Sequence, residues 1–254
     1  MPPPGFRPDH AALQILRSHL HAPQVGATYG VLCFGDTSVA TCLPAGGLAL
    51  GNLHEIGACG PEAETGTVVA GFTACLLARL PDRRPIFWIA PCCDLHVPGL
   101  PAYGLDPGRL ILVHTGSDAE TLAAMETVLR AGTAAAVLGE VGKLGRLPAR
   151  RLQLACRKRG STGFVLRRWP HGRRETTEEA TAAVTRWEVA PAPSEAACRE
   201  PGPTRWRVML QHARGGHEGA WIMETTADDA AHPLRVVAKL ADTAPAPDRR
   251  RLAG

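Results

Sequence analysis

Aromatic residues and recognisable catalytic motifs are scarce in this sequence of 254 residues. It contains two Tyr and five Phe, which argues against an aromatic-rich β-sandwich. Neither GxSxG nor HExxH occurs, so neither a hydrolase nucleophile elbow nor a zinc-protease helix is indicated. The eight cysteines form no CxxC pair and have no regular spacing, and several lie in apolar runs, where a free thiol behaves as a small hydrophobe. This cysteine usage favours a reducing compartment.

No segment has the composition of a signal-peptide core or a membrane span. The N-terminal stretch MPPPGFRPDH has no apolar core, and the longest uncharged runs contain Gly, Pro and His. Hydrophobic residues make up 45% of the chain, enough for a sizeable buried core, and the net charge is +4. We therefore expect a soluble, cytoplasmic protein without a membrane contact.

Hydrophobic periodicity predicts alternating strands and helices in the larger, N-terminal part of the chain. A short helix over 10–20 follows the capping residue Asp9, and a buried helix covers 65–80. Pro148 is expected at the first position of a helix that ends before Gly160. The other predicted elements are strands over 50–56, 85–90, 110–114, 134–140 and 162–168, a helix over 119–131 between Ser117 and Gly132, and a loop-rich stretch over 91–109.

The pattern then changes to strand-like pieces without intervening helices, namely TRWEVAP, TRWRVMLQHAR, GAWIMETT and PLRVVA. GGHEG is typical of a hairpin turn between two of them. The sequence therefore predicts an α/β fold with a mainly parallel sheet flanked by helices and a C-terminal antiparallel extension. The predicted divisions are an N-terminal segment 1–28, a core 29–190, an exposed connection 191–204, a β extension of the same domain 205–240 and a disordered tail 241–254.

The stretch GACGPEAETGTVVAGF (57–72) resembles a phosphate-binding loop but departs from its pattern. The spacing from Gly60 to Gly66 is one residue too long, and Thr67 stands where the phosphate-binding lysine belongs. Glu64 adds a carboxylate, and two unit charges about 4 Å apart interact by roughly 4 kcal/mol at an effective dielectric near 20. We expect a degenerate loop without nucleotide hydrolysis, cofactor or enzyme activity, in which a helix N-terminus over 66–69 retains at most weak anion affinity. The loop residues concerned are Gly60, Glu64, Thr65, Gly66 and Thr67.

Two other groups have the chemistry of a site. Cys92, Cys93, Asp94 and His96 offer metal-ligating atoms, but no second ligand pair accompanies them, so a strand end packed in the core and no metal is the expected reading. Glu140 is the one carboxylate in a plausible catalytic position, at the end of a predicted parallel strand. It has no evident partner, and no catalytic residue is predicted.

Charge is distributed unevenly along the chain. Residues 141–174 contain eleven Lys or Arg and no acidic residue, so the rest of the chain has a net charge of −7 against the overall +4. So many cations cannot all point inward, and one face should be basic. That face is a solvated surface, a contact for nucleic-acid backbone, or a contact for an acidic protein. The contact candidates, with Trp169 as a possible base-stacking residue, are Lys143, Arg146, Arg150, Arg151, Arg157, Lys158, Arg159, Arg167, Arg168, Trp169, Arg173 and Arg174.

Four stretches resemble the ImuA family of damage-inducible mutagenesis proteins, which are diverged relatives of RecA and are related to SulA. They cover residues 43–56, 104–140, 149–168 and 205–225. The resemblance implies a RecA-like core and an accessory role in error-prone translesion synthesis during the SOS response. It implies three partners, which are an ImuB-type Y-family polymerase homologue, RecA and the alpha subunit of an error-prone replicative-type polymerase, and recruitment to damaged DNA in the nucleoid.

The resemblance to RecA also implies that residues needed for nucleotide hydrolysis and DNA binding are missing. The RecA loop GPESSGKT falls on GPEAETGT (60–67), the water-activating glutamate falls near Cys92, and the strand-end aspartate falls near Gly139, next to Glu140. One RecA DNA-binding loop falls near 141–148, where this chain is short. The other falls on 169–183, where acidic residues accompany Arg173 and Arg174 and would repel phosphates.

The implied function is therefore that of a non-catalytic adaptor whose contact with DNA is weak or indirect. Two alternatives stay open: a SulA-like inhibitor of cell division that binds the tubulin-like division protein, and a RecA-like nucleotide-dependent DNA-binding protein.

Overall fold

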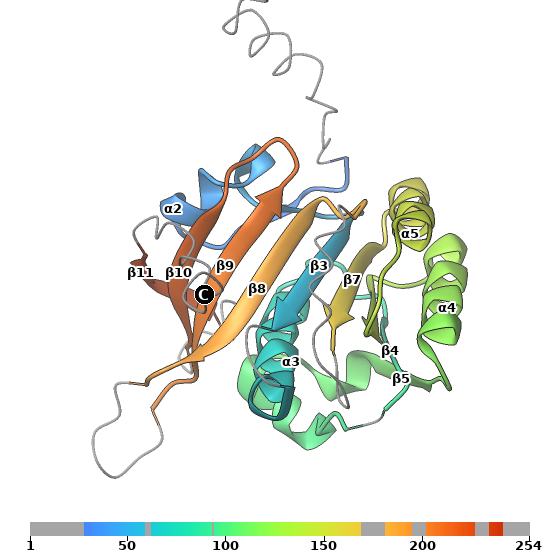
Figure 1. Cartoon of the computed structure of the whole chain (residues 1–254), viewed down its shortest axis with the longest axis horizontal. Coiled ribbons are helices and arrows are strands. Elements are labelled where there is room, and N and C mark those ends of the chain that lie inside the picture. Colours follow the sequence, from blue (N-terminus) through green and yellow to red (C-terminus); the bar gives the residue numbers. More distant parts are fainter. Residues whose placement is uncertain are drawn as a thin grey trace, which may run out of the picture.

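The computed structural model describes residues 28–58, 62–92, 94–168, 181–194, 202–226 and 234–240, without the side chains of 62–65. The predicted helix over 10–20 lies outside these residues. The described part is an α/β fold built on a large mixed sheet with helices on both faces (Figure 1). The alternation of β and α elements that the sequence predicts is confirmed.

The large sheet has nine strands in the order β11-β10-β9-β8-β3-β7-β6-β4-β5. The strands from β8 to β5 are parallel to one another, and β9, β10 and β11 continue the sheet antiparallel. Their bounds are β3 Leu53–Ala58, β4 Ile86–Ala90, β5 Leu110–His114, β6 Ala136–Val141, β7 Thr162–Arg167, β8 Thr185–Ala192, β9 Arg205–Ala213, β10 Gly219–Thr225 and β11 Leu234–Lys239. β8 thus runs two residues into the predicted connection.

Three helices cover the sheet on opposite faces. α3 (Glu62–Ala78) and the 3₁₀ segments η2 (Val97–Tyr103) and η3 (Pro107–Arg109) belong to one side, where Phe72 and Leu76 of α3 are buried. α4 (Asp118–Ala131) and α5 (Arg146–Arg159) lie side by side over the other face (Figure 1). The apolar residues therefore form two separate clusters, one on each side of the sheet.

The ends of α4 form as the sequence predicts. The Ser117 hydroxyl accepts a hydrogen bond from the Glu120 N–H at 3.3 Å, and Gly132 ends the helix in the left-handed region at φ 70°. A side-chain oxygen at the N-cap satisfies a helix N–H that has no partner within the helix, and glycine adopts positive φ without a Cβ clash.

The starts of α3 and α5 differ from prediction. α5 begins at Arg146 after Gly145, so Pro148 is its third residue rather than its first. Proline is tolerated there because the N–H groups of the first turn have no partner within the helix. α3 begins at Glu62, three residues before the predicted start, because the helix-forming residues Glu62, Ala63 and Glu64 extend it toward the N-terminus.

The antiparallel strands share the core of the parallel ones. Trp187, Trp206 and Trp221 are fully or almost fully buried, and the Phe72 ring of α3 meets the Trp206 ring edge-on with centroids 6.0 Å apart. Such edge-to-face pairs add to the hydrophobic gain of burying both rings. The C-terminal strands therefore contribute side chains to the same hydrophobic core.

A short N-terminal unit completes that side of the molecule. It contains β1 (Val31–Leu32), α2 (Thr37–Ala40), the 3₁₀ turn η1 (Pro44–Gly46) and β2 (Leu48–Ala49), and β1 pairs with β2 antiparallel. Asp36 caps α2, and the Trp221 indole N–H donates to the Ser38 hydroxyl at 2.9 Å. This contact joins the unit to β10.

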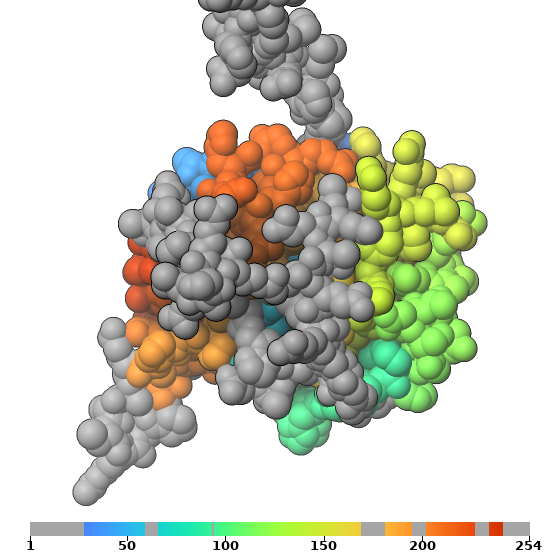
Figure 2. Space-filling model, viewed as in Figure 1, coloured from blue at the N-terminus to red at the C-terminus, as the bar shows by residue number. Residues whose placement is uncertain are grey.

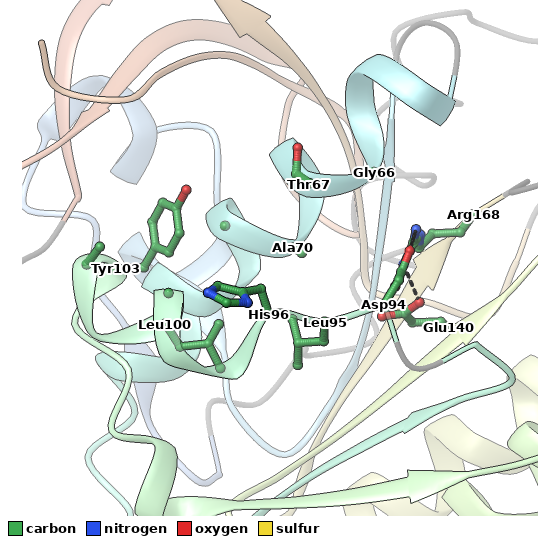
Figure 3. Close-up of a pocket in the computed structure, with 13 residues that line it drawn as sticks. Gly66, Thr67, Ala70, Asp94, Leu95, His96, Leu100, Tyr103, Glu140 and Arg168 are labelled. Atoms are coloured by element: carbon green, nitrogen blue, oxygen red, sulfur yellow. Dashed lines mark hydrogen bonds and ion pairs between the residues drawn. The ribbon is translucent and has the colours of Figure 1, made fainter. Parts of the chain in front are cut away.

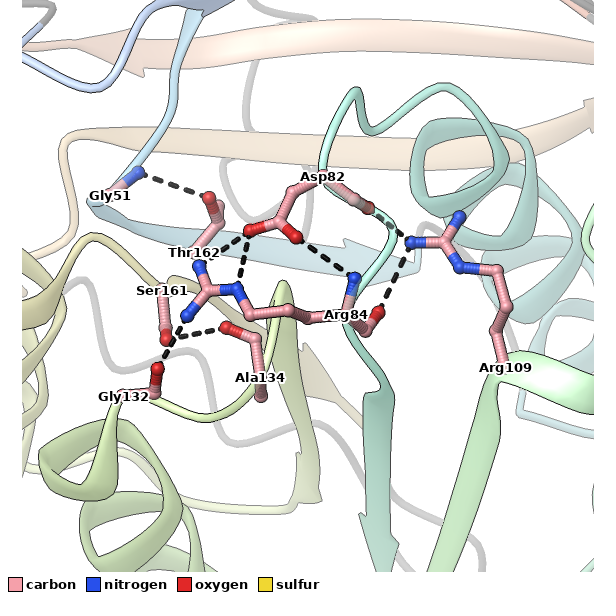
Figure 4. Close-up of polar contacts among 8 residues, drawn as sticks. All are labelled: Gly51, Asp82, Arg84, Arg109, Gly132, Ala134, Ser161 and Thr162. Carbon is pink, nitrogen blue, oxygen red and sulfur yellow. Dashed lines mark hydrogen bonds and ion pairs between the residues drawn. The ribbon is translucent and has the colours of Figure 1, made fainter.

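Polar contacts tie together the amino ends of the parallel strands (Figure 4). Arg84 donates to Asp82 and to the Gly132 carbonyl, and the Ser161 hydroxyl donates to the Ala134 carbonyl at 2.6 Å. Arg84 and Asp82 at this end therefore have structural partners. None of the described helices is both long and apolar enough to cross a membrane.

Candidate functional site

A cavity of about 260 Å³ lies at the carboxyl ends of the parallel strands, where ligands gather in open α/β sheets. Asp94 follows β4, Glu140 lies near the end of β6, and Arg168 follows β7. Helix α3 forms one wall of the cavity, and the 3₁₀ segment η2 forms another (Figure 3). The lining residues are Gly66, Thr67, Ala70, Gly71, Asp94, Leu95, His96, Gly99, Leu100, Ala102, Tyr103, Glu140 and Arg168.

One arginine occupies the centre of the charged end of this cavity. The Arg168 guanidinium donates to Glu140 Oε2 at 2.7 Å and to Asp94 Oδ1 and Oδ2 at 2.9 and 2.7 Å (Figure 3). Its side chain is only 11% exposed. A guanidinium that bridges two carboxylates fills the position that a divalent cation would take between them.

Glu140 has a second partner on the side away from Arg168. The Trp88 indole N–H donates to Glu140 Oε1 at 2.6 Å, so both carboxylate oxygens accept a hydrogen bond. The prediction that Glu140 has no partner is therefore wrong. The partners come from β4 and from the end of β7, strands that its own sequence neighbourhood does not reveal.

The two carboxyl groups on Arg168 have pKa values shifted in opposite directions. Burial raises the pKa of Glu140 above its usual range, although the Arg168 charge and the Trp88 hydrogen bond oppose this. Hydrogen bonding from Arg168 lowers the pKa of Asp94, whose side chain is 48% exposed. The same cation thus holds one carboxylate at the rim and a second, desolvated one beneath it.

The predicted phosphate loop is largely helical. Gly66 and Thr67 lie in the second turn of α3, so a helix N-terminus over 66–69 is wrong. Backbone N–H groups at that position bond to carbonyls of the preceding turn and cannot converge on an anion. Glu64 and Thr65 also belong to α3, and Gly60 lies outside the described residues.

A close approach between α3 and η2 forms the apolar part of the cavity. A Cβ on Gly71 would lie 2.9 Å from Cζ of Tyr103, too near for any side chain without a shift of the ring. The Tyr103 ring in turn packs 6.2 Å from Trp206, centroid to centroid. Gly71 is therefore needed here for space, not for backbone conformation.

The cysteine-containing stretch forms no metal centre among the described residues, where no cluster of three His, Cys, Asp or Glu is present. Asp94 is held by Arg168, and Cys92 is exposed, which corrects the expectation that it packs in the core. Cys93 lies outside the described residues.

The basic stretch divides into inward and outward groups. Arg167 and Arg168 point into the fold, and Arg167 Nη1 lies 3.0 Å from Glu55 Oε1 of β3. The expectation of one continuous basic face is therefore wrong at these two residues. Trp169, Arg173 and Arg174 lie outside the described residues. The outward group, on α5 and just before it, is Lys143, Arg146, Arg150, Arg151, Arg157, Lys158 and Arg159.

The chain is 42% identical over 221 residues to Protein ImuA from two strains of Caulobacter vibrioides, NA1000/CB15N and CB 15, and the match covers 84% of this chain and 91% of each relative. The chain belongs to the ImuA family.

No family model matches the chain. Among solved structures, SulA from Pseudomonas aeruginosa is similar at a TM-score of 0.39 and 23% identity, over 45% of this chain and 96% of SulA. The identity to Protein ImuA confirms the resemblance to this family that the sequence predicts.

Arg168 has a different role from the one that the sequence predicts. The sequence places it among the surface cations, although an arginine directly after a parallel strand lies at the same sheet end as Asp94 and Glu140. That shared edge is the signal that could have found it.

Proposed function

We propose that this protein is a non-catalytic accessory factor of error-prone translesion DNA synthesis after DNA damage. Membership of the ImuA family supports involvement in damage-inducible mutagenesis. The absence of catalysis is supported by the Arg168 bridge between Asp94 and Glu140, which is the observation that carries the proposal. A nucleotide hydrolase needs such carboxylates free to hold Mg²⁺ or to activate water.

We further propose that the core is a RecA-like fold whose nucleotide chemistry has been lost. The strand before α3 lies centrally in the sheet, between β7 and β8, as expected for a strand that once led to a phosphate loop. Helix α3 includes residues 62–67 of the stretch that would form that loop. The connection from β6 to α5 covers only 142–145, which leaves little room for a DNA-binding loop.

The proposed partners are an ImuB-type Y-family polymerase homologue, RecA and the error-prone polymerase alpha subunit, bridged by this chain. The outward cations of α5 support a role in binding, because Arg150, Arg157 and Lys158 form no ion pair with another described residue. We propose that protein partners, rather than DNA, provide the main contacts.

The catalytic half of the proposal is tested with the purified chain. We expect no magnesium-dependent ATP binding by calorimetry and no phosphate release. ATP binding in the micromolar range, with turnover that Glu140→Gln abolishes, would overturn the non-catalytic assignment. Arg83→Gln is the matched control, since Arg83 is an exposed residue remote from Glu140 in the sequence and outside the cavity lining.

The cellular half is tested by complementation. In a strain of the source organism that lacks this gene, we expect the frequency of damage-induced mutation to fall and the intact chain to restore it. A Glu140→Gln variant whose folding is verified by circular dichroism is also expected to restore it, because no catalysis is required. A normal mutation frequency in the deletion strain would sink the functional assignment.

A further inference from the structure

The outward face of α5 carries an apolar stripe. Leu147 and Leu154 are 69% and 59% exposed, the highest values for large apolar side chains in the described part of the chain. They are seven positions apart, which places them on the same helix face two turns apart. Single exposed leucines are ordinary on protein surfaces, but these two share one helix face, with Arg150 and Arg151 exposed in the turn between them.

A groove adjoins this stripe. A cavity of about 380 Å³ is lined by residues of α5 and by Arg130 of α4, and Leu154 and Ala155 are its apolar members. The other lining residues are Arg151, Lys158 and Arg159. Figure 2 shows the side chains of these two helices, in green to yellow-green, at the surface of the molecule. A segment that covers Leu154 would therefore also enter the space between the helices.

Cations surround the apolar stripe on both sides. Helical geometry puts Arg150 and Arg157 on one side of Leu154 and Lys158 and Arg159 on the other. These four form no ion pair with any residue that the structure describes. Arg151 and Arg130 share Glu126, at 2.7 and 2.6 Å, so their charge is partly neutralised within the fold.

We propose that this α5 surface, made of Leu147, Leu154, Arg150, Arg157, Lys158 and Arg159, binds an acidic amphipathic helix of a partner protein. The inference rests on the proposed adaptor function and names the chemistry of one of its contacts. Heptad-spaced leucines match the apolar face of a partner helix, and the surrounding cations match acidic residues on its flanks.

The leucines distinguish this occupant from the alternatives. Nucleic-acid backbone is held by cations alone, and exposed leucines offer it neither charge nor a stacking face. In a dimer formed through this surface, the α5 cations of one copy would face those of the other, and like charges across an interface are unfavourable. Only a segment that is both acidic and apolar satisfies the whole surface.

The surface can be probed with a fluorescein-labelled synthetic peptide of about three heptads, with leucine at the a and d positions and glutamate at most others. We expect fluorescence anisotropy to report binding to the full chain. The double variant Leu147→Ser/Leu154→Ser should weaken it about tenfold or more, as loss of buried apolar anchors does. The charge reversal Arg150→Glu/Arg157→Glu should weaken it similarly and reduce the dependence on salt.

Matched variants control for the chemistry of each change. Leu112→Ser removes a leucine that is 46% exposed on β5, and Arg83→Glu reverses an exposed charge before β4. Both should leave the affinity for the peptide within about twofold, because neither residue belongs to the α5 surface. Circular dichroism of every variant should match the original chain.

Three outcomes of the binding measurements contradict the proposal. They are no peptide binding at low salt, equal binding by the leucine variant, and preferential binding of an oligo-dT strand of about 20 nucleotides that depends on the arginines but not on the leucines. Sedimentation that detects a dimer dissolved by the leucine variant would assign the surface to a second copy instead.

Complementation separates this inference from the proposed function. If the leucine variant restores damage-induced mutation as well as the intact chain does, the α5 surface is not the contact but the adaptor function stands. If the intact chain itself fails to restore mutation, the proposed function falls, whatever the peptide result.

Discussion

The carboxyl-end cavity and the outer face of α5 use arginine in opposite ways. In the cavity, the Arg168 side chain is 11% exposed and forms ion pairs with two carboxylates of the same chain. On α5, Arg150 and Arg157 are exposed and have no acidic partner among the described residues. The first arrangement closes a site internally, and the second leaves charge available for another molecule.

This difference separates the two parts of the proposed function. Arg168 occupies both the Asp94 and the Glu140 carboxylate, which supports the scaffold part of the proposed function. Unpaired cations beside exposed leucines favour recognition of a partner. The predictions below test whether the inward charges stabilise the fold and the outward ones do not.

The largest effect is expected at Arg168. Arg168→Met leaves the Glu140 carboxylate buried beside Asp94 without a cation, and removing one partner of a buried ion pair costs about 3–5 kcal/mol. Urea unfolding should report a loss of this size in the free energy of unfolding. The same replacement on α5, Arg150→Met, should change it by less than about 0.5 kcal/mol.

A second substitution tests the cause of that loss. Glu140→Gln in the Arg168→Met background removes the unpaired charge, so it should recover part of the lost stability. If Arg168→Met changes the free energy of unfolding as little as Arg150→Met does, the Arg168 bridge does not stabilise the fold. The contrast between the two regions then disappears.

The next effect concerns a buried group that has hydrogen bonds but no counter-charge. His54 of β3 is fully buried, with Nδ1 2.7 Å from the Thr185 hydroxyl and Nε2 2.9 Å from the Ala49 carbonyl. Burial lowers the pKa of His54 to about 4, partly opposed by the Ala49 carbonyl. The ring is thus neutral in the folded protein near pH 7.

This pKa predicts a loss of stability in acid. Because the folded pKa lies below the unfolded one, the unfolded chain takes up the proton first as the pH falls. The contribution of His54 to the free energy of unfolding is intact above pH 6.5 and is lost progressively down to about pH 4. The total loss is about 3 kcal/mol. We expect the free energy of unfolding, measured with urea between pH 7 and pH 4, to depend less steeply on pH in the His54→Gln variant than in the original chain. Parallel curves for both proteins would contradict the assignment.

Local signals in the sequence predicted most of the fold. Ser117 and Gly132 mark the ends of α4 because capping depends only on neighbouring residues. The start of α3 was missed because likeness to a phosphate loop outweighed the helix-forming residues in PEAETG. The hairpin over 215–219 was found since turn chemistry is local as well.

The candidate site could be predicted only in part. Glu140 and Asp94 were singled out as individual residues, but their joint partner Arg168 reaches them from a third strand. Pairing across β4, β6 and β7 depends on the order of strands in the sheet, which a single sequence does not encode in any local pattern. The exposure of Leu147 and Leu154 likewise follows from which face of α5 the sheet covers.

A smaller effect is expected where the two regions are joined. Asp118 Oδ2 of α4 accepts hydrogen bonds from the N–H groups of Gly142 and Lys143, at 2.9 and 3.0 Å, in the connection from β6 to α5. Asp118→Ala removes both from a half-buried site and should cost about 1 kcal/mol in urea unfolding. Asp118→Asn, which keeps one acceptor oxygen, should recover part of it. Equal losses in both variants would point to charge rather than hydrogen bonding.

The smallest effect is expected on the outer face of α5. Leu147→Ser/Leu154→Ser removes apolar groups that are mostly in water already, so little hydrophobic free energy is lost. The lower helix propensity of serine should cost about 0.3 kcal/mol at each position. Thermal unfolding followed by circular dichroism should therefore shift by only a few degrees. A loss of several kcal/mol would mean that the leucines are covered within this chain, and the contrast between a closed cavity and an open surface would fail.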